Sequence, residues 1–407
     1  MKESKMATVD GVSAALSCDD ILCEILSRLP PQSVIRSITV AKRWLHFICS
    51  PSFGSHYLSR WQVSYNLLGF FVCNTLYLGR RHQDGLCRPK SEPALPFLST
   101  SNEGDDLKFS GILKQLGFFI DSSNGLLLCG RHPRTYFVWN PISKQQCRLP
   151  HPRVFFEDLC MAFLVDDYPS DNMLYKVIRA KCECKLDTKT VAIETFDSRT
   201  STWHYSTLNC SSTLSLSPWT VAAVINGVVH WFAEQGNIAV YDPDNDKRNV
   251  VLIRLPSSND FDERAIGVSS DRLLQYGCST KSETEIWVLE KERKSFFCTS
   301  SSSTSFDSCW KLRYRLNFKL MWKKNPTLMV AFWSRSKETQ ILSFLPQNSE
   351  SVLIRCGSDI FLLNLASQHL EVVRYSGRGS SIMWDFSRVV PYFRPAWPHI
   401  SHRVVSP

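Results

Sequence analysis

The sequence predicts a multidomain chain, with a small all-α module at the N-terminus followed by a large all-β domain. Three observations predict this division. Apolar residues in the first sixty positions have helical spacing. After residue 58 the spacing changes to the alternation of strands. Two later stretches, about 100 residues apart, repeat the same order of turns and strands.

The first helix is predicted before residue 30, where apolar residues recur at intervals of one, three and four positions. These residues are Ile21, Leu22, Ile25, Leu26 and Leu29. Ser17 can cap the start of the helix, and the two acidic residues that follow Cys18 favour its N-terminal dipole. Pro30-Pro31 removes a backbone donor and ends the helix.

A second helical segment is predicted from Val34 through Trp44 and Ile48, ending at Pro51. About forty residues cannot bury so much apolar surface alone, because domains of that size are marginal without a disulfide, a metal or a partner. The segment 16–58 is therefore interpreted as a helical module that docks onto a partner. The alternative is a helical hairpin that packs on the rest of its own chain.

The order and spacing of these residues resemble the F-box. Ser17 departs from the family, which usually has Pro there. The resemblance implies that the module binds the small adaptor of the SKP type that links to a cullin and a RING protein. The residues that it assigns to adaptor binding are Leu16, Ile21, Leu22, Ile25, Leu26, Leu29, Pro30, Val34, Val40, Trp44 and Phe53.

The composition adds limits on compartment and partners. The net charge of +9 is a mild excess that favours acidic partners without identifying them. Neither a secretory signal nor a membrane-spanning apolar run is apparent, so the 15 Cys are expected as free thiols in a reducing compartment, the cytoplasm or the nucleus. Cysteines such as Cys18, Cys129 and Cys147 are interpreted as small buried apolar residues. Cys182-Glu-Cys184 lacks the further ligands of a zinc site, and no metal is predicted.

The second part of the chain carries an internal repeat. In the stretch Ser123–Pro150, an Asn-Gly turn leads into an apolar strand, Trp-Asn-Pro ends the next strand, and Leu-Pro closes the unit. The stretch Ile225–Pro256 has the same order of features, and partial copies appear at 192–203, 267–289 and 351–373. Strand repeats of roughly 40 to 50 residues indicate a β-propeller, with about six to seven blades expected here. Residues 384–407 show no clear repeat.

This region resembles the F-box-associated, kelch-like propeller domain found after plant F-boxes, on the strength of Asn124-Gly125, Trp139-Asn140-Pro141, Asn226-Gly227 and Tyr241-Asp242-Pro243. The expected organisation is a disordered N-terminus (1–15), an F-box (16–60) and a substrate-binding propeller (61–407). Contacts with a substrate are expected from loops such as Gly130–Arg134 and Glu234–Asn237, but the propeller face that they occupy is left open.

The sequence offers no catalytic residue and no cofactor site, because the common nucleophile, zinc, P-loop and dinucleotide patterns are absent. His230, between Val229 and Trp231, is interpreted as a structural residue of a strand. Asp166-Asp167 and Asp242-Pro243-Asp244 are interpreted as turn and capping residues rather than a carboxylate pair.

The stretch 311–324 alternates basic and apolar residues, which predicts a strand with one basic face. This face is interpreted as solvated. The alternative is a binding face for an acidic peptide or nucleic acid, with Tyr314 and Trp322 available for stacking.

The favoured function is a non-catalytic substrate receptor of an SCF-type ubiquitin ligase, in which the F-box binds the adaptor and the propeller holds an unknown protein substrate. Two alternatives remain open at this point. One is a propeller enzyme or carbohydrate-binding module with a helical extension, and the other is a nucleic-acid-binding protein that uses the basic face at 311–324.

Overall fold

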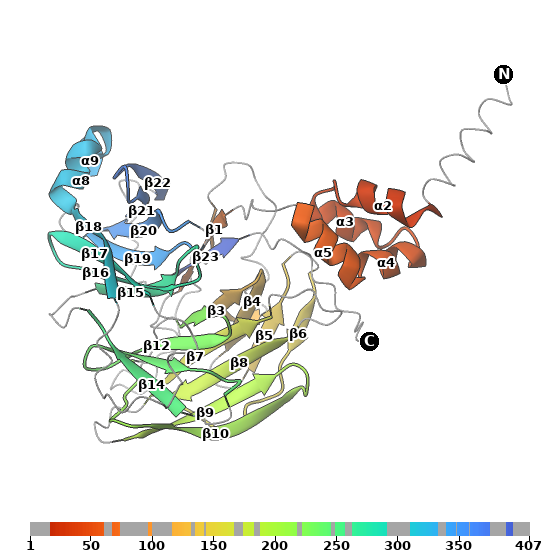
Figure 1. Cartoon of the computed structure of the whole chain (residues 1–407), viewed down its shortest axis with the longest axis horizontal. Helices are drawn as coiled ribbons and strands as arrows, with labels where there is room; N and C mark the ends of the chain where they lie inside the picture. Colours follow the sequence, from red (N-terminus) through yellow and green to blue (C-terminus); the bar gives the residue numbers. More distant parts are fainter. Residues whose placement is uncertain are drawn as a thin grey trace.

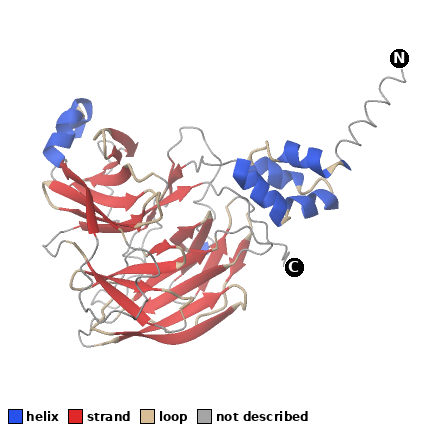
Figure 2. Ribbon diagram, viewed as in Figure 1, coloured by secondary structure: helices blue, strands red, loops and turns tan. Residues whose placement is uncertain are grey.

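The computed structural model describes most of the chain outside residues 1–16 and 394–407. The described residues are 17–60, 67–73, 97–99, 116–131, 135–141, 144–166, 174–182, 188–217, 222–245, 249–256, 263–290, 310–332, 339–346, 348–357, 359–374 and 388–393. Helices come first and strands dominate the remainder, as Figure 2 shows. The predicted fold class, a small helical module followed by an all-β propeller-type domain, is confirmed. The expected disorder of residues 1–15 lies outside the described residues.

In the described residues, the N-terminal module contains four short helices that form one bundle (Figure 1). They are α2 (Asp19–Leu26), α3 (Pro31–Ser37), α4 (Lys42–Ile48) and α5 (Pro51–Arg60). The second predicted segment is thus two helices separated by a turn. Pro51 does not end the helical module, because it stands at the start of α5, where its missing N–H would have no partner in any case.

The four helices share one apolar core. The side chains fully or almost fully buried there are Leu22, Leu26, Val34, Ile48, Phe53 and Tyr57. The Tyr57 hydroxyl also donates a 2.7 Å hydrogen bond to the carbonyl of Leu29, so α5 satisfies a carbonyl in the turn after α2. The residues of α5 therefore complete the core that the α2 stripe begins.

The start of α2 differs in detail from the prediction. Cys18, rather than Ser17, occupies the N-cap position, and no side chain caps the helix there. The guanidinium of Arg43 instead donates to the carbonyl of Ser17 and to the carboxylate of Asp19, each at 2.5 Å. The start of α2 is thereby tied to the start of α4.

The strands form six blade-like units in the described part of the chain. The first contains β2 (Phe97–Ser99), β1 (Leu67–Cys73) and β23 (Arg388–Phe393), and the second contains β3 (Phe118–Ser123), β4 (Leu126–Arg131), β5 (Thr135–Trp139) and β6 (Gln146–Arg148). The third contains β7 (Leu159–Val165), β8 (Tyr175–Lys181), β9 (Thr190–Asp197) and β10 (Thr202–Cys210), and the fourth contains β11 (Ala223–Ile225), β12 (Val228–Ala233), β13 (Asn237–Tyr241) and β14 (Asn249–Arg254).

The fifth unit contains β15 (Glu263–Val268), β16 (Leu274–Ser279), β17 (Glu283–Leu289) and β18 (Trp310–Asn317), and the sixth contains β19 (Thr339–Phe344), β20 (Ser351–Cys356), β21 (Asp359–Asn364) and β22 (Leu370–Arg374). A short parallel pairing of β10 with β14 joins the third and fourth units. The innermost strands touch in the cyclic order β3, β7, β11, β15, β19, β23 and back to β3. This closed order is that of a six-bladed propeller.

The ring is closed by strands from the two ends of the chain. β23 pairs antiparallel with β1, from Leu67 opposite Phe393 to Cys73 opposite Arg388. Phe71 of β1 stacks on Phe119 of β3, with ring centroids 4.2 Å apart. The region 384–407, which shows no repeat in sequence, therefore supplies the inner strand of the first blade.

The two repeats fall two blades apart, in agreement with their spacing. Asn124-Gly125 joins β3 to β4 with φ values of 44° and 77°, and Asn226-Gly227 joins β11 to β12 with φ values of 50° and 79°. Two successive positive φ angles are those of a type I′ hairpin turn. The predicted tight turns are confirmed.

The basic stretch 311–324 is a strand followed by a helix. β18 alternates exposed and partly buried residues as predicted. The chain then turns into α8 (Phe318–Lys324), which Asn317 caps by accepting a hydrogen bond from the Leu320 N–H at 3.2 Å, and a second helix, α9 (Pro326–Phe332), follows. Trp322 lies on the buried face of α8 against Phe361, so it is not available to stack on a ligand.

Candidate functional site

The helical module presents apolar side chains to solvent. Seven large apolar residues are exposed in the described part of the chain, and three of them belong to this module: Ile21, Ile25 and Val40, with 43%, 41% and 63% exposure. Ile21 and Ile25 are one turn apart on α2 and therefore share a face. An exposed apolar surface on so small a module makes it a candidate interaction site.

Val40 lies close to the same end of α2. It stands in the turn between α3 and α4, three residues before Arg43. Because Arg43 binds the carbonyl of Ser17 and the carboxylate of Asp19, this turn is held beside the start of α2, where Ile21 lies. The exposed residues of the helix and the turn thus belong to neighbouring elements.

The residues that the sequence assigned to adaptor binding divide into three groups. Ile21, Ile25, Pro30 and Val40 are exposed, Leu29 and Trp44 are half-buried, and Leu22, Leu26, Val34 and Phe53 are at most 1% exposed. Leu16 lies outside the described residues. The other ten assigned residues lie in one module, and their contact with an adaptor stays a prediction.

Four of the assigned residues form part of the apolar core of the module. Leu22, Leu26, Val34 and Phe53 are enclosed in the module's own core, so their side chains are not accessible to a partner. Their burial holds the helices together and sets the positions of the exposed residues. Helical spacing identifies an apolar stripe, but it does not separate the side that faces the core from the side that faces outward.

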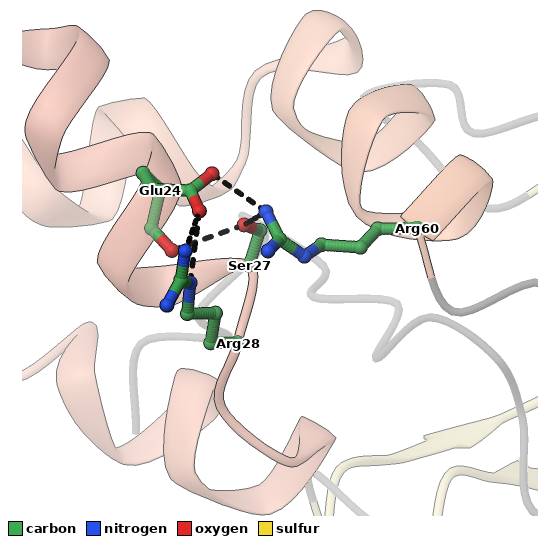
Figure 3. Close-up of polar contacts among 4 residues, drawn as sticks. All are labelled: Glu24, Ser27, Arg28 and Arg60. Atoms are coloured by element: carbon green, nitrogen blue, oxygen red, sulfur yellow. Dashed lines mark hydrogen bonds and ion pairs between the residues drawn. The ribbon is translucent and has the colours of Figure 1, made fainter.

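A polar cluster links α2 to α5, as Figure 3 shows. The carboxylate of Glu24 accepts hydrogen bonds from Arg60 Nη1 at 2.6 Å and from Arg28 Nε at 2.8 Å. Arg60 Nη1 also reaches the hydroxyl of Ser27 at 3.3 Å. These two guanidinium groups, Arg60 first and then Arg28, lower the pKa of Glu24 to about 2. This link between the first and last helices was not foreseen from the sequence, because the two residues of the Glu24–Arg60 pair are 36 positions apart.

The cysteines give no sign of a metal site in the described residues. Ten cysteines of the described part of the chain are free thiols, with no disulfide between them. Burial raises the pKa of Cys278 to about 11 and that of Cys356 to about 12, so both thiols are protonated at neutral pH. Cys18 and Cys147 are exposed, contrary to the prediction that they are buried. Cys184 lies outside the described residues, whereas Cys182 packs against Cys160 with the sulfurs 3.2 Å apart.

His230 and Asp242 have the structural settings that the sequence predicts. His230 is 4% exposed in β12, and its Nδ1 lies 3.2 Å from the carbonyl of Ala223. Burial lowers the pKa of His230 to about 4, so the ring is neutral at pH 7 and Nδ1–H is the donor. The carboxylate of Asp242 accepts a hydrogen bond from the Asp244 N–H at 3.0 Å, which is an Asx turn.

The basic face of β18 is partly neutralised by acidic neighbours. Lys311 pairs with Glu290 at 3.3 Å, Arg313 with Asp271 at 4.0 Å, and Arg315 with Glu285 at 2.5 Å. A nucleic-acid site needs basic side chains available to phosphates. These ion pairs favour the interpretation of the strand as a solvated face.

No described helix is both long and apolar enough to cross a membrane.

Comparison with known proteins agrees with this architecture. A sequence profile of the F-box domain matches residues 18–56, and one of the F-box associated beta propeller domain matches residues 105–354. The F-box protein At5g03970 of Arabidopsis thaliana is 46% identical over 402 residues, covering 97% of this chain and 93% of that protein.

More distant relatives also carry F-box names. The F-box protein At5g07610 of Arabidopsis thaliana is 24% identical over 74% of this chain and 70% of its own length. The putative F-box/kelch-repeat protein At3g17280 of the same plant is 28% identical over 45% of each chain. A four-helix module with an exposed apolar face, a six-bladed propeller and these matches together show that the chain belongs to the F-box proteins with an F-box-associated β-propeller.

Proposed function

We propose that the chain is the substrate-recognition subunit of an SCF-type ubiquitin ligase. F-box domains generally bind SKP-type adaptors. The observation that supports this role here is the exposure of Ile21, Ile25 and Val40 on a module whose own core is already complete. In this role the exposed residues bind the adaptor, together with Pro30 and the half-buried Leu29 and Trp44.

The chain acts by proximity rather than by chemistry of its own. Holding a substrate on the propeller raises the concentration of its lysines near the ubiquitin-loaded enzyme, which accelerates transfer without a reacting group in this chain. F-box proteins are generally non-catalytic adaptors. A pocket lined by Thr213, Ser215, Glu234 and Leu252 has a volume of about 10 Å³ and accommodates one water.

Reconstitution tests this proposal. The full-length chain is mixed with a plant SKP-type adaptor, a cullin and a RING protein, and the mixture is separated by gel filtration. The chain is expected to co-elute with the cullin when the adaptor is present and to elute alone when the adaptor is omitted. Separate elution in both mixtures would contradict the proposal, and co-elution without the adaptor would show a different mode of assembly.

A further inference from the structure

The connection between β6 and β7, residues 149–158, lies on one face of the propeller. Strands β3 to β6 are antiparallel neighbours, so their connections alternate between the two ends of the blade. The β6–β7 loop is therefore at the end opposite the β3–β4 turn. The Tyr392 hydroxyl of β23 donates a hydrogen bond to the carbonyl of Gly125 in the β3–β4 turn, so this end of β23 lies near that turn. Leu67, the first residue of β1, pairs with the neighbouring Phe393, so β1 begins at the same end. The loop thus lies away from the point where the chain enters the propeller.

A fully buried ion pair holds this loop. Arg179 of β8 and Glu194 of β9 are both 0% exposed, with Nη1 and Oε2 2.7 Å apart. The other carboxylate oxygen of Glu194 accepts a hydrogen bond from the N–H of Arg153 at 2.6 Å. Arg179 Nη1 donates to the carbonyl of Val154 at 3.1 Å. Two successive backbone groups of the loop are therefore fixed by charged side chains inside the blade.

Aromatic side chains add two further attachments. The indole N–H of Trp203 donates to the carbonyl of Pro150 at 2.8 Å. Phe156, 1% exposed, lies with its ring centre 5.1 Å from the Arg179 guanidinium carbon. The loop is thus rigid at both sides of Phe155, and Phe155 itself is 58% exposed.

Two basic side chains lie in and just before this loop. Arg148 and Arg153 are both exposed, and no described residue forms an ion pair with either of them. His151 lies between them, with its Nε2 3.4 Å from Arg148 Nη2. Glu157 is the exposed acidic residue of the same loop. A rigid aromatic residue beside unpaired arginines has the composition of an interaction hot spot.

We propose that this loop is a substrate-contact surface of the propeller, and that it binds an acidic protein segment with an apolar residue seated against Phe155. The positive charges of Arg148 and Arg153 complement the negative charge of the acidic segment. The buried Arg179–Glu194 ion pair holds the loop in place before binding, which lowers the entropy cost of association. The inference rests on the proposed function for its biological role. The loop at 234–237, also predicted to contact substrate, connects the second and third strands of its blade and so lies at the same end. Most of the other predicted loop, 130–134, lies outside the described residues.

A polypeptide fits this loop better than a nucleic acid does. Nucleic-acid sites extend a basic stripe along many phosphates. Here only two exposed arginines, Arg148 and Arg153, lie in or beside the loop, too few for such a stripe. The single projecting phenyl ring is suited to one apolar side chain.

Defined peptide pools test the proposal on the full-length chain. One fluorescent pool of 15-residue peptides has a central Leu flanked by mixed Asp, Glu, Gly and Ser positions, and a second pool has Lys and Arg in place of Asp and Glu. A fluorescent single-stranded RNA of equal length is the third probe. The chain is expected to bind the acidic pool at least tenfold more tightly than the other two probes.

Variants then locate the site. Phe155→Ser should weaken binding of the acidic pool at least tenfold, and the double change Arg148→Glu with Arg153→Glu should remove the preference for it. Matched controls should bind like the wild type: Tyr205→Ser, at a residue 52% exposed on β10, and the pair Lys311→Glu with Arg313→Glu on β18. Unchanged binding by the loop variants, equal losses in the controls, or a preference for the RNA would each overturn the proposal.

Adaptor affinity, measured in the same preparations, separates this inference from the proposed function. If the adaptor binds and the loop variants bind the acidic pool like the wild type, the loop inference is wrong and the receptor role stands. If the adaptor does not bind while the loop variants lose the acidic pool, the receptor role is wrong and the loop remains a peptide-binding surface.

Discussion

At the scale of single residues, burial of the neutral His230 ring makes the stability of the propeller sensitive to acid. In the unfolded chain a histidine has a pKa of about 6.5, whereas burial lowers that of His230 to about 4. Between these values the unfolded state binds more protons, so stability is complete above pH 6.5 and falls as the pH decreases to 4.

A histidine variant measures this contribution. The amide of Asn can donate to the carbonyl of Ala223 but does not titrate, so His230→Asn should remove the acid sensitivity. Between pH 7 and pH 4 the wild type should lose about 3 kcal/mol more unfolding free energy than the variant, because the pKa difference is about 2.5 units. Urea unfolding at the two pH values is the measurement, and equal losses would show that His230 is solvated or paired differently.

The Arg179–Glu194 pair is a second residue-scale test. Arg179→Met leaves the Glu194 carboxylate buried without its charged partner, which should cost about 3 to 5 kcal/mol of unfolding free energy. The double change Arg179→Met with Glu194→Leu should be less destabilising than Arg179→Met alone, because no buried charge is left uncompensated. Chemical denaturation of the full-length chain compares them. A double variant less stable than the single one would contradict this account of the pair.

At the scale of elements, the β11–β12 turn depends on the backbone freedom of Gly227. A Cβ at this position would meet no atom within 4 Å, so space is not the constraint, and the φ of +79° is the conformation that side chains oppose. Gly227→Val should therefore destabilise the propeller by about 1 kcal/mol or more. Gly227→Asn is the control, because Asn tolerates positive φ and should cost less. Equal thermal unfolding of wild type and Gly227→Val would contradict the turn assignment.

Elements with a local signal were predicted well. The stripe of α2, the hairpin turns and the repeated strands each carry their pattern within a few residues. α5 was missed as a separate helix because Pro51 is consistent with either the end of one helix or the start of another. α8 was missed because its apolar residues, Phe318, Met321 and Trp322, follow a strand without a clear break.

At the scale of the whole molecule, the features that the sequence does not disclose are those made by distant residues. The closure of the propeller pairs Leu67 with Phe393, and no repeat marks the second of these strands. The Glu24–Arg60 contact and the fixing of the 149–158 loop by Arg179 likewise depend on folding. The helical spacing of α2 identified Ile21 and Ile25 together with Leu22 and Leu26. It could not separate the exposed pair from the buried pair, because all four residues lie on the same apolar stripe.

The most direct test of the central claim is titration of the full-length chain with a plant SKP-type adaptor. Ile21 and Ile25 are exposed, so changing both to Asp should leave the module folded while opposing an apolar contact. Binding should weaken at least thirtyfold, since loss of an interface anchor typically costs about 2 kcal/mol or more. Leu320→Asp, at a residue 56% exposed on α8, is the matched control and should bind like the wild type. Equal affinity of the Ile21 and Ile25 double variant, or no adaptor binding by the wild type, would contradict the account.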